Sequence, residues 1–286
     1  MFKAGYISLV GKPNVGKSTL MNTLLKEKVS SVTPKPQTTR HQILGILNLP
    51  DVQAIFIDTP GLMARQKDKL DERMVGKARS AIMDSDISLL MVEPYEKEII
   101  SDFFKRENTI LAINKIDKIS KPDLLPLIEY YNNLDLFLKI IPISAKKGIN
   151  CDSLLFEIIS LLPLHPPFYD TDILSTHPER FFVEEIIKEK IFLCYGDEIP
   201  YDTAVVVEEF KEREDGKDYI RAIIYVNRTS QKGILIGKKG EALKRIGERA
   251  RKEIEAFHNK PVYLELIVKE KRDWRKKDKI LNEFGY

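Results

Sequence analysis

The pattern that most constrains this chain is G-K-P-N-V-G-K-S at residues 11–18, which stands between an apolar, strand-like run and a helix-like stretch. Glycines let the backbone turn tightly enough to aim several N–H groups at phosphate oxygens, and the following helix adds the positive end of its dipole. A chance match in a chain of this length is on the order of one in a hundred. The segment therefore predicts a phosphate-binding loop, with the Lys17 amine on the β and γ phosphates and the Ser18 hydroxyl on Mg²⁺.

Short apolar runs alternate with helix-like stretches through the first part of the chain. Strands are expected over residues 4–10, 53–57, 87–92, 109–113 and 138–143, and helices over 18–28, 69–84, 96–105, 121–132 and 150–162. Such alternation is typical of a parallel α/β sheet. The run 43–49 lies close enough to residue 53 to form a hairpin, so one antiparallel edge strand is also expected. The predicted fold class here is α/β with a mixed, mostly parallel sheet.

The pattern changes where four prolines, at positions 163, 166, 167 and 178, stand among Thr, Asp and Ser residues. Such a stretch cannot continue a helix or bury much surface, so we expect a linker. Beyond it, helices over 183–193, 241–256 and 274–282 and strands over 204–210, 219–226 and 262–268 predict an α+β domain. With 286 residues the chain has room for two cores. We expect domains at 1–165 and 179–286, joined by a linker at 166–178.

Three further motifs follow predicted strands. D-T-P-G at 58–61 offers a carboxylate that can hold Mg²⁺ through water and a glycine N–H that can sense the γ phosphate. N-K-I-D at 114–117 offers an aspartate that can accept the ring N–H and the amino protons of guanine, a pair that adenine lacks, and S-A-K at 144–146 can bring a backbone N–H to the guanine oxygen. Each motif alone is more often a turn, but their order at strand ends favours a guanine nucleotide over a kinase or ATPase substrate.

Charge is unevenly spread over the second domain. Residues 181–220 hold 5 basic and 12 acidic residues, whereas residues 228–252 hold 9 basic and 2 acidic ones. A charge run is usually a solvated face, but a local reversal of this size indicates an electropositive site. Inside it lies I-L-I-G-K-K-G, residues 234–240, whose glycines allow a nucleic-acid backbone to approach closely. This pattern is typical of a KH domain, which clamps about four nucleotides.

Around that turn, we expect Ile234, Leu235 and Ile236 to form an apolar floor, with Leu243 and Ile246 behind it. Bases can pack in such a groove, while basic side chains contact the phosphates. The order of elements fits a type II KH arrangement. The basic residues in question are Lys244, Arg245, Arg249 and Arg251.

Longer strings carry a family resemblance that covers nearly the whole chain. The first 165 residues resemble a translation-factor-type GTPase, and three segments resemble the Era family: P-Q-T-T-R-H at 36–41, Q-K-G-I-L-I-G-K-K-G-E-A-L-K-R-I-G-E-R-A-R at 231–251 and V-K-E-K-R-D-W-R at 268–275. The resemblance implies a P-loop GTPase domain followed by a type II KH domain, and slow conversion of GTP to GDP and phosphate. It also implies binding to the 3′ end of small-subunit ribosomal RNA and a role in assembly and maturation of the 30S subunit.

The resemblance also implies roles around the γ phosphate. The segment 36–41 corresponds to switch I, in which Thr39, with Thr38 as its neighbour, closes over Mg²⁺. Leu62 stands where Ras-like enzymes carry the water-orienting glutamine, a substitution found in Era-like GTPases. As a hypothesis, Asn14 helps to hold K⁺ between the phosphates, and Arg40 is the alternative source of that positive charge.

The expected site residues fall into four groups. Those expected to act in catalysis are Lys17, Thr39, Gly61 and Asn14. Those expected to bind GTP are Gly11, Lys12, Pro13, Asn14, Val15, Gly16, Lys17, Ser18, Thr38, Thr39, Asp58, Thr59, Pro60, Gly61, Leu62, Asn114, Lys115, Ile116, Asp117, Ser144, Ala145 and Lys146. Those expected to bind RNA are Lys232, Ile234, Ile236, Gly237, Lys238, Lys239, Gly240, Lys244, Arg245 and Arg249. The metal groups are Ser18, Thr39 and, through water, Asp58 for Mg²⁺, and Asn14 for K⁺.

Location and assembly follow from what the chain lacks. It has no run of about 20 apolar residues, no secretory signal, and only two distant cysteines, so we expect a cytoplasmic protein. A monomer is the expected state, although no residue pattern decides the oligomeric state. The resemblance implies peripheral contact with the cytoplasmic face of the inner membrane. A second hypothesis is therefore a membrane-associated signalling GTPase whose basic domain binds anionic lipid. A glycine turn and an apolar floor serve no purpose on a lipid surface, which favours RNA.

Overall fold

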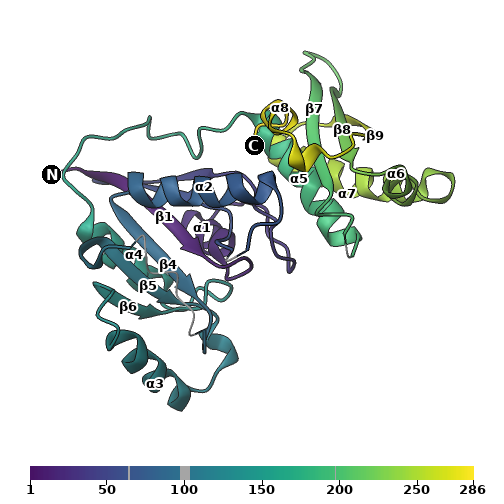
Figure 1. The fold of residues 1–286 in the computed structure, drawn as a ribbon. Coiled ribbons are helices and arrows are strands. Elements are labelled where there is room, and N and C mark those ends of the chain that lie inside the picture. The colour runs from purple at the N-terminus through teal and green to yellow at the C-terminus, as the bar shows by residue number, and fades with distance from the viewer. Residues whose placement is uncertain (64, 97–103, 197) are drawn as a thin grey trace. The chain divides into compact units, whose positions relative to one another are not determined.

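A computed structural model describes residues 1–63, 65–96, 104–196 and 198–286. The chain divides into two compact units, which are Met1–Gln66 with Asp71–Thr176, and Lys67–Leu70 with His177–Tyr286 (Figure 1). The helix predicted over residues 96–105 falls mostly outside the described residues. No helix in the described ranges is long and apolar enough to cross a membrane.

The first unit is built on a six-stranded sheet in the order β2-β3-β1-β4-β5-β6. Only β2 is antiparallel to its neighbour, so the predicted mixed, mostly parallel sheet is confirmed. The central β4 and β5 are buried along their whole length, as expected for strands covered on both faces. The strands are β1 (Lys3–Gly11), β2 (Ile43–Leu49), β3 (Val52–Asp58), β4 (Ile87–Val92), β5 (Thr109–Ile113) and β6 (Lys139–Pro142).

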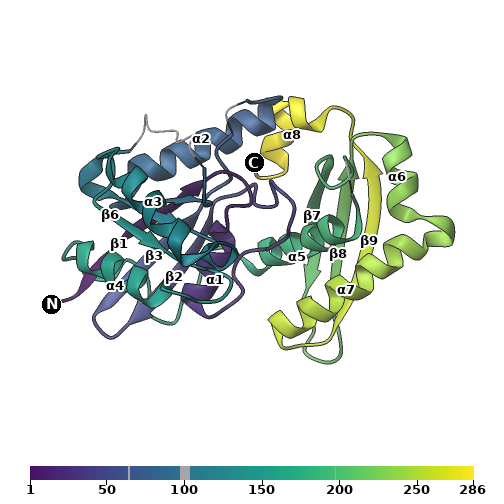
Figure 2. The ribbon, with the colours of Figure 1, turned by 90° about the horizontal axis from the view of Figure 1, so that it is seen from below.

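Helices cover this sheet. On one face α1 and α4 lie side by side (Figure 2). Ala78 and Ile82 on α2 pack against Val10 of β1, while Tyr131 on α3 packs in a cluster with β4 and β5. The helices are α1 (Lys17–Leu25), α2 (Lys69–Asp84), α3 (Lys121–Asn132) and α4 (Cys151–Leu161). The parallel strands thus direct their carboxyl ends, and the loops that follow, toward one edge.

The segment predicted as a linker makes more contacts than expected. The buried Gln53 amide accepts hydrogen bonds from the backbone N–H groups of Phe168 and Tyr169 at 2.7 and 3.0 Å and donates one to the Tyr169 carbonyl at 2.8 Å. Further along, the Ile46 N–H donates to the Leu174 carbonyl at 2.8 Å. Residues 166–176 therefore belong to the first unit, because side-chain and edge-strand partners satisfy a backbone that its prolines keep out of regular structure.

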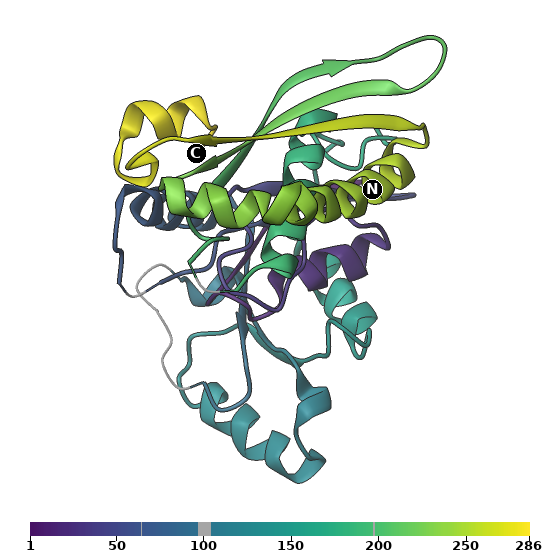
Figure 3. The same cartoon turned by 90° about the vertical axis from the view of Figure 1, so that its right-hand side faces the viewer.

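The second unit has the order α5 (Glu179–Cys194), β7 (Thr203–Lys211), β8 (Asp218–Val226), α6 (Thr229–Ile236), α7 (Glu241–His258) and β9 (Val262–Glu270). Its sheet runs β7-β8-β9, with β9 parallel to β8 at one edge. Helices α5 and α7 pack against each other, and α7 also packs on β9 (Figure 3). This is the arrangement expected of a type II KH domain, although α6 had not been predicted as a helix.

The chain after β9 closes the core of the second unit. Trp274 is fully buried, and its indole N–H donates to the Asp202 carbonyl at 3.0 Å. Helix α8 spans Asp278–Glu283, and the ring of the next residue, Phe284, stacks on Tyr225 of β8. Trp274 is thus a packing residue, as its amphipathic surroundings in the sequence suggest.

Glu184 on α5 gives this unit a pH-dependent stability. Burial raises the pKa of Glu184 to about 7 from 4.5, although its Oε1 accepts a hydrogen bond from the Val207 N–H at 2.8 Å. Because the pKa of Glu184 is higher in the folded state, its contribution to the free energy of unfolding is complete below about pH 4.5 and is lost as the pH rises through 7. We expect Glu184→Gln, which keeps the acceptor but cannot ionise, to raise the unfolding temperature at pH 8 by about 4 °C and to leave it unchanged at pH 4.

Thermal unfolding of the full chain at both pH values measures this effect. Glu212→Gln, at an exposed position, is the matched control and should change neither value. Parallel pH curves for the wild type and Glu184→Gln would contradict the prediction.

Candidate functional site

The loop between β1 and α1 has the backbone of an anion-binding turn. Gly11, Asn14 and Gly16 have φ values of 150°, 65° and 107°. A side chain at Gly16 would clash with the Asn114 amide, and its φ also favours glycine. The loop is therefore drawn tightly around the N-terminus of α1, where free N–H groups can meet phosphate oxygens.

Lys17 crosses the inside of this loop. Its Nζ donates to the carbonyls of Gly11 and Lys12 at 3.1 and 3.0 Å. Burial lowers the pKa of Lys17 to about 8, a shift that the negative charges of Asp58 and Glu96 oppose. A phosphate group placed here would raise the pKa of Lys17 again, because an opposite charge nearby favours the ionised amine.

Four oxygen-bearing side chains meet beside Lys17, and three of them are the predicted Mg²⁺ groups. The Ser18 hydroxyl donates to Asp58 Oδ2 at 2.6 Å and lies 3.0 Å from Thr39 Oγ1, and Ser30 Oγ donates to the same Asp58 oxygen at 2.8 Å. Two hydroxyls and a carboxylate are hard oxygen ligands of the kind that Mg²⁺ selects. The predicted Mg²⁺ groups Ser18, Thr39 and Asp58 are thus brought together by α1, switch I and the end of β3.

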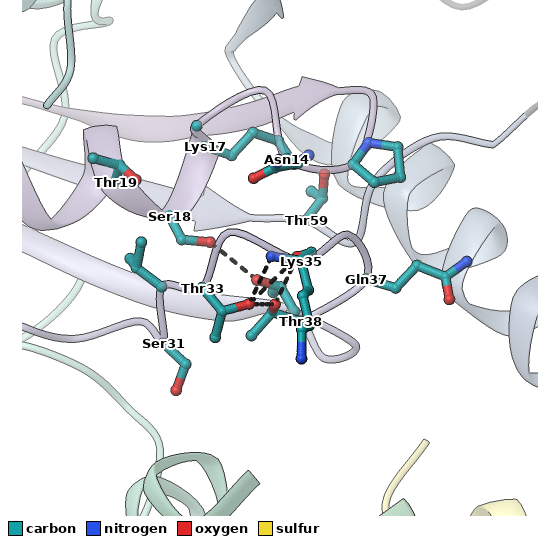
Figure 4. Close-up of a pocket in the computed structure, with 15 residues that line it drawn as sticks. Asn14, Lys17, Ser18, Thr19, Ser31, Thr33, Lys35, Gln37, Thr38 and Thr59 are labelled. Atoms are coloured by element: carbon teal, nitrogen blue, oxygen red, sulfur yellow. Dashed lines mark hydrogen bonds between the residues drawn. The ribbon is translucent and has the colours of Figure 1, made fainter. Parts of the chain in front are cut away.

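Thr38 points to a different set of partners from Thr39. Its hydroxyl lies 2.6 Å from Thr33 Oγ1 and donates to the Lys35 carbonyl at 3.0 Å (Figure 4). These contacts hold the loop before Thr39 together, so Thr39 is the threonine that faces Ser18, another of the predicted Mg²⁺ groups. Figure 4 shows the pocket that this loop and the P-loop enclose, with Asn14, Lys17 and Ser18 along its wall.

The loop after β3 approaches the P-loop closely. A Cβ at Gly61 would lie 2.6 Å from the Pro13 nitrogen, so only glycine fits. The Leu62 N–H donates to the Gly11 carbonyl at 3.0 Å, while its side chain is buried beside Val10 and α2. Leu62 therefore offers no side chain that could orient a water molecule, in agreement with its apolar character. Thr59 is also buried and donates to the Leu9 carbonyl at 2.7 Å.

Asn14, the expected K⁺ ligand, and Arg40, the alternative source of positive charge, lie in different surroundings. Asn14 reaches across the pocket, where its Nδ2 donates to the Pro34 carbonyl of switch I at 3.1 Å. Arg40 is buried, with only 2% of its surface exposed, whereas a loop arginine is more often a surface residue.

The two segments expected to recognise the base, 114–117 and 144–146, are joined by side-chain hydrogen bonds to each other and to the P-loop. Asn114 donates to the Val15 carbonyl at 2.7 Å and accepts from the Ala145 N–H at 2.9 Å. Ser144 donates to Asp117 Oδ1 at 2.6 Å, and this hydrogen bond lowers the pKa of Asp117. Asp117 is therefore held ionised and pre-oriented, as an acceptor for two guanine donors must be.

Lys115 connects the segment 114–117 to the P-loop, and two glutamates that the sequence did not mark lie beside Lys115 and Lys12. Its Nζ donates to the Asn14 carbonyl at 2.8 Å and pairs with Glu93. Glu96, in the same loop after β4, pairs with Lys12 at 2.8 Å. No motif marks these two carboxylates, since a pair of glutamates in a loop resembles any solvated turn.

In the second unit, the G-x-x-G turn has the geometry that glycine permits. Gly237 has φ 72° and ψ 177°, and a Cβ there would lie 2.6 Å from the Ala242 Cβ. Gly240 has φ 80°, and Lys238 and Lys239 between the glycines are exposed. The turn thus presents bare backbone and two lysines at the N-terminus of α7.

A groove begins at this turn and runs between α7 and β9. Its floor differs from the predicted one, because α6 directs Leu235 into the core, and Ile246 is also fully buried. The residues that line it are Gly240, Leu243, Lys244, Gly247, Glu248, Arg251, Tyr263, Leu264 and Leu266. The β9 residues were missed because a strand's alternating pattern does not tell which edge stays open.

Basic residues frame this groove. Lys244 and Arg251 line it, and the buried Nε of Arg251 has no hydrogen-bond partner among the described residues. Lys232, Arg245 and Arg249 do not line it; Arg249 is exposed and its Nη1 donates to Cys194 Sγ at 3.5 Å. The groove is thus apolar below and positively charged at its margin, as expected for unstacked bases and their phosphates.

Known proteins match both units. A family model described as "50S ribosome-binding GTPase" matches residues 6–120, and one described as "KH domain" matches residues 198–275. The GTPase Era of Geotalea daltonii is 46% identical over 292 residues, spanning 100% of this chain and 98% of the relative. The chain belongs to the Era family of GTPases. As a member of that family it binds and hydrolyses GTP.

Era relatives extend to chloroplasts and to solved structures. A chloroplastic GTPase ERA-like protein of Arabidopsis thaliana is 42% identical, covering 99% of this chain and 69% of the relative. A crystal structure of an Aquifex aeolicus Era variant bound to GDP and AlF₄⁻ has a TM-score of 0.94 at 42% identity, with 100% and 99% of the two chains covered. An Era complex with MgGDPNP and nucleotides 1506–1542 of 16S ribosomal RNA has a TM-score of 0.95 at 41% identity over the same shares.

Proposed function

We propose that this GTPase binds the 3′ end of small-subunit ribosomal RNA in the α7–β9 groove and assists assembly and maturation of the 30S subunit. The observation that carries the proposal is that one chain combines the hydrogen-bonded groups expected for a guanine nucleotide, around Ser18 and Asp117, with a groove between α7 and β9 that has an apolar floor and carries Lys244 and Arg251. An Era structure of 41% identity that holds both MgGDPNP and that RNA supports it.

In the proposed mechanism, the chain's own groups hold the nucleotide in place. The P-loop N–H groups and Lys17 bind the β and γ phosphates, Asp117 reads guanine, and the Gly61 N–H senses the γ phosphate. Ser18, Thr39 and Asp58 would hold Mg²⁺, and that ion would supply positive charge beside the phosphates. Since Leu62 is buried, hydrolysis relies on positioning and is slow. Loss of the γ phosphate releases Thr39 and Gly61, which changes how well switch I and the loop 58–62 are ordered.

K⁺ is the second cation in this proposal. Asn14 lies at the junction of the P-loop and switch I, where a monovalent cation can add positive charge between the phosphates. We expect GTP turnover in K⁺ buffer to exceed that in Na⁺ buffer by about tenfold, a change of about 1.4 kcal/mol in the barrier. Steady-state phosphate release at matched ionic strength measures this. Equal rates in the two salts would remove the K⁺ site.

Coupling between the two sites is tested by measuring GTP hydrolysis of the full chain in K⁺ buffer, with and without a short RNA copying the 3′ end of small-subunit ribosomal RNA. We expect that RNA to raise the rate severalfold, because ordering one site biases the other. Tight RNA binding with an unchanged rate would contradict coupling and leave two independent modules. Failure to bind that RNA at all would contradict the proposed function.

A cytoplasmic monomer with peripheral contact to the inner membrane stays a prediction. The exposed lysines and arginines of residues 228–252 could meet anionic lipid headgroups as well as phosphates. Flotation with anionic vesicles, and light scattering for the oligomeric state, check these points.

A further inference from the structure

An exposed aromatic side chain lies at the end of the groove away from the G-x-x-G turn. Tyr263 is the second residue of β9, it lines the groove, and 59% of its surface is exposed. Gly240 directly precedes α7, whereas Tyr263 follows the short connection from the other end of that helix. Leu264 and Leu266 pack with the core on the α7 side, so the alternation of side chains places the Tyr263 ring on the opposite face of this edge strand. A strand of RNA clamped at the turn and laid along the groove would therefore reach Tyr263 last, where it crosses the open edge of β9.

The Tyr263 ring rests on a second tyrosine. Tyr219 of β8 is its direct neighbour in the parallel register, and the two rings stack with centroids 5.9 Å apart at an angle of 14°. One side of the Tyr263 ring is thus covered by Tyr219. Its high exposure leaves the rest of the ring open to a planar ligand.

The supporting tyrosine is itself held in place. The Tyr219 hydroxyl donates to Glu265, which also accepts from Arg221 Nε at 2.9 Å. The Arg221 guanidinium lies 5.7 Å from the centre of the Tyr219 ring, within the range of a cation–π contact. Because these contacts fix the Tyr219 ring, the Tyr263 ring that stacks on it loses little freedom when a ligand binds.

We propose that Tyr263, supported by Tyr219, is a stacking site for one nucleobase of a single-stranded RNA, next to the nucleotides held by the G-x-x-G turn. The proposal rests on the proposed function of the groove. The ligand is a base because the site continues a groove whose other wall carries Lys244 and Arg251, groups that attract a polyanion. Stacking tolerates any base, so this position adds affinity without reading sequence.

The test is a double-mutant cycle between protein and RNA on the full chain. Single abasic sites are placed one at a time in a ten-nucleotide copy of the ribosomal RNA 3′ end, and affinities are measured by fluorescence anisotropy. In the wild-type protein, we expect one abasic site outside the four clamped nucleotides to weaken binding about tenfold. In Tyr263→Ala, the intact RNA should bind about tenfold more weakly, and that same abasic site should cost nothing further.

Two controls separate stacking from structural damage. Tyr263→Phe keeps the ring and should bind as the wild type does. Tyr263→Ala should still bind a four-nucleotide RNA with wild-type affinity, which shows that its groove is intact.

The outcomes that would overturn the proposal are distinct from one another. Additive effects of Tyr263→Ala and every abasic site, an unchanged affinity of Tyr263→Ala for the ten-nucleotide RNA, or equal weakening for both RNA lengths would each reject the stacking site alone. Failure of the wild-type protein to bind either RNA would reject the proposed function of the groove, and the stacking site with it.

Discussion

Asp117→Asn is expected to weaken GTP binding by about 100-fold to 1,000-fold and to allow XTP to bind instead. The Asp117 carboxylate, held by Ser144 at 2.6 Å, can accept both the ring N–H and the amino group of guanine. Charge-assisted hydrogen bonds of this kind contribute about 1.5–3 kcal/mol each. Asparagine offers one acceptor and one donor, a pair that matches the N–H and the 2-oxo group of xanthine.

The measurement is equilibrium binding of fluorescent GTP and XTP analogues, followed by hydrolysis of both nucleotides. Asp123→Asn is the matched control, because Asp123 is also held by a serine, Ser120 at 2.6 Å, but sits on the first turn of α3 outside the base motifs. A variant at Asp117 that binds GTP and XTP with wild-type affinities would refute the guanine assignment.

Gly237→Asp is expected to weaken RNA binding by more than about 100-fold while leaving GTP hydrolysis without RNA unchanged. A Cβ at Gly237 meets Ala242 at 2.6 Å, and φ of 72° strains any residue with a side chain. The new carboxylate would also repel phosphates at the place where they approach the backbone most closely.

Gly216→Asp is the matched control, because it adds the same charge at another glycine with positive φ, away from the G-x-x-G turn. Gly216 lies between β7 and β8 with φ of 92°, and nothing lies within 4 Å of a Cβ there. It should bind RNA as the wild type does. Gly237→Asp with full RNA affinity would instead favour lipid or protein as the partner of the basic segment, and anionic vesicles would then be the next ligand to try.

Most of the first unit could be predicted because its signals are local. Strands such as β4 and β5 are continuous apolar runs. Each nucleotide motif follows a parallel strand of the sheet, namely β1, β3, β5 or β6, so the topology alone brings the motifs to one edge. The hairpin of β2 and β3 was equally clear from its short connection. Thr39 rather than Thr38 as the metal-facing threonine came from the family resemblance, and the side-chain contacts of the two residues agree with it.

The features that were missed depend on contacts between distant residues. Gln53 orders the backbone at Phe168 and Tyr169, more than a hundred positions away, so proline content alone predicted a linker. Leu235 was assigned to the groove because it stands beside the glycine turn, but the helical period of α6 turns it into the core. Tyr263 carries no motif, and its importance emerges only when β9 is known to be the open edge.

The place of β9 at the end of the fold orders events during synthesis of the protein. The side chains expected to bind the nucleotide all precede residue 147, and their unit is complete by Thr176. One wall of the groove, by contrast, is β9, which joins β8 only after the crossover through α6 and α7. Since domains fold as units from the N-terminus of a nascent chain, nucleotide can load before any RNA can be held. If the groove binds RNA as proposed, we expect that incomplete chains do not compete with the finished protein for it.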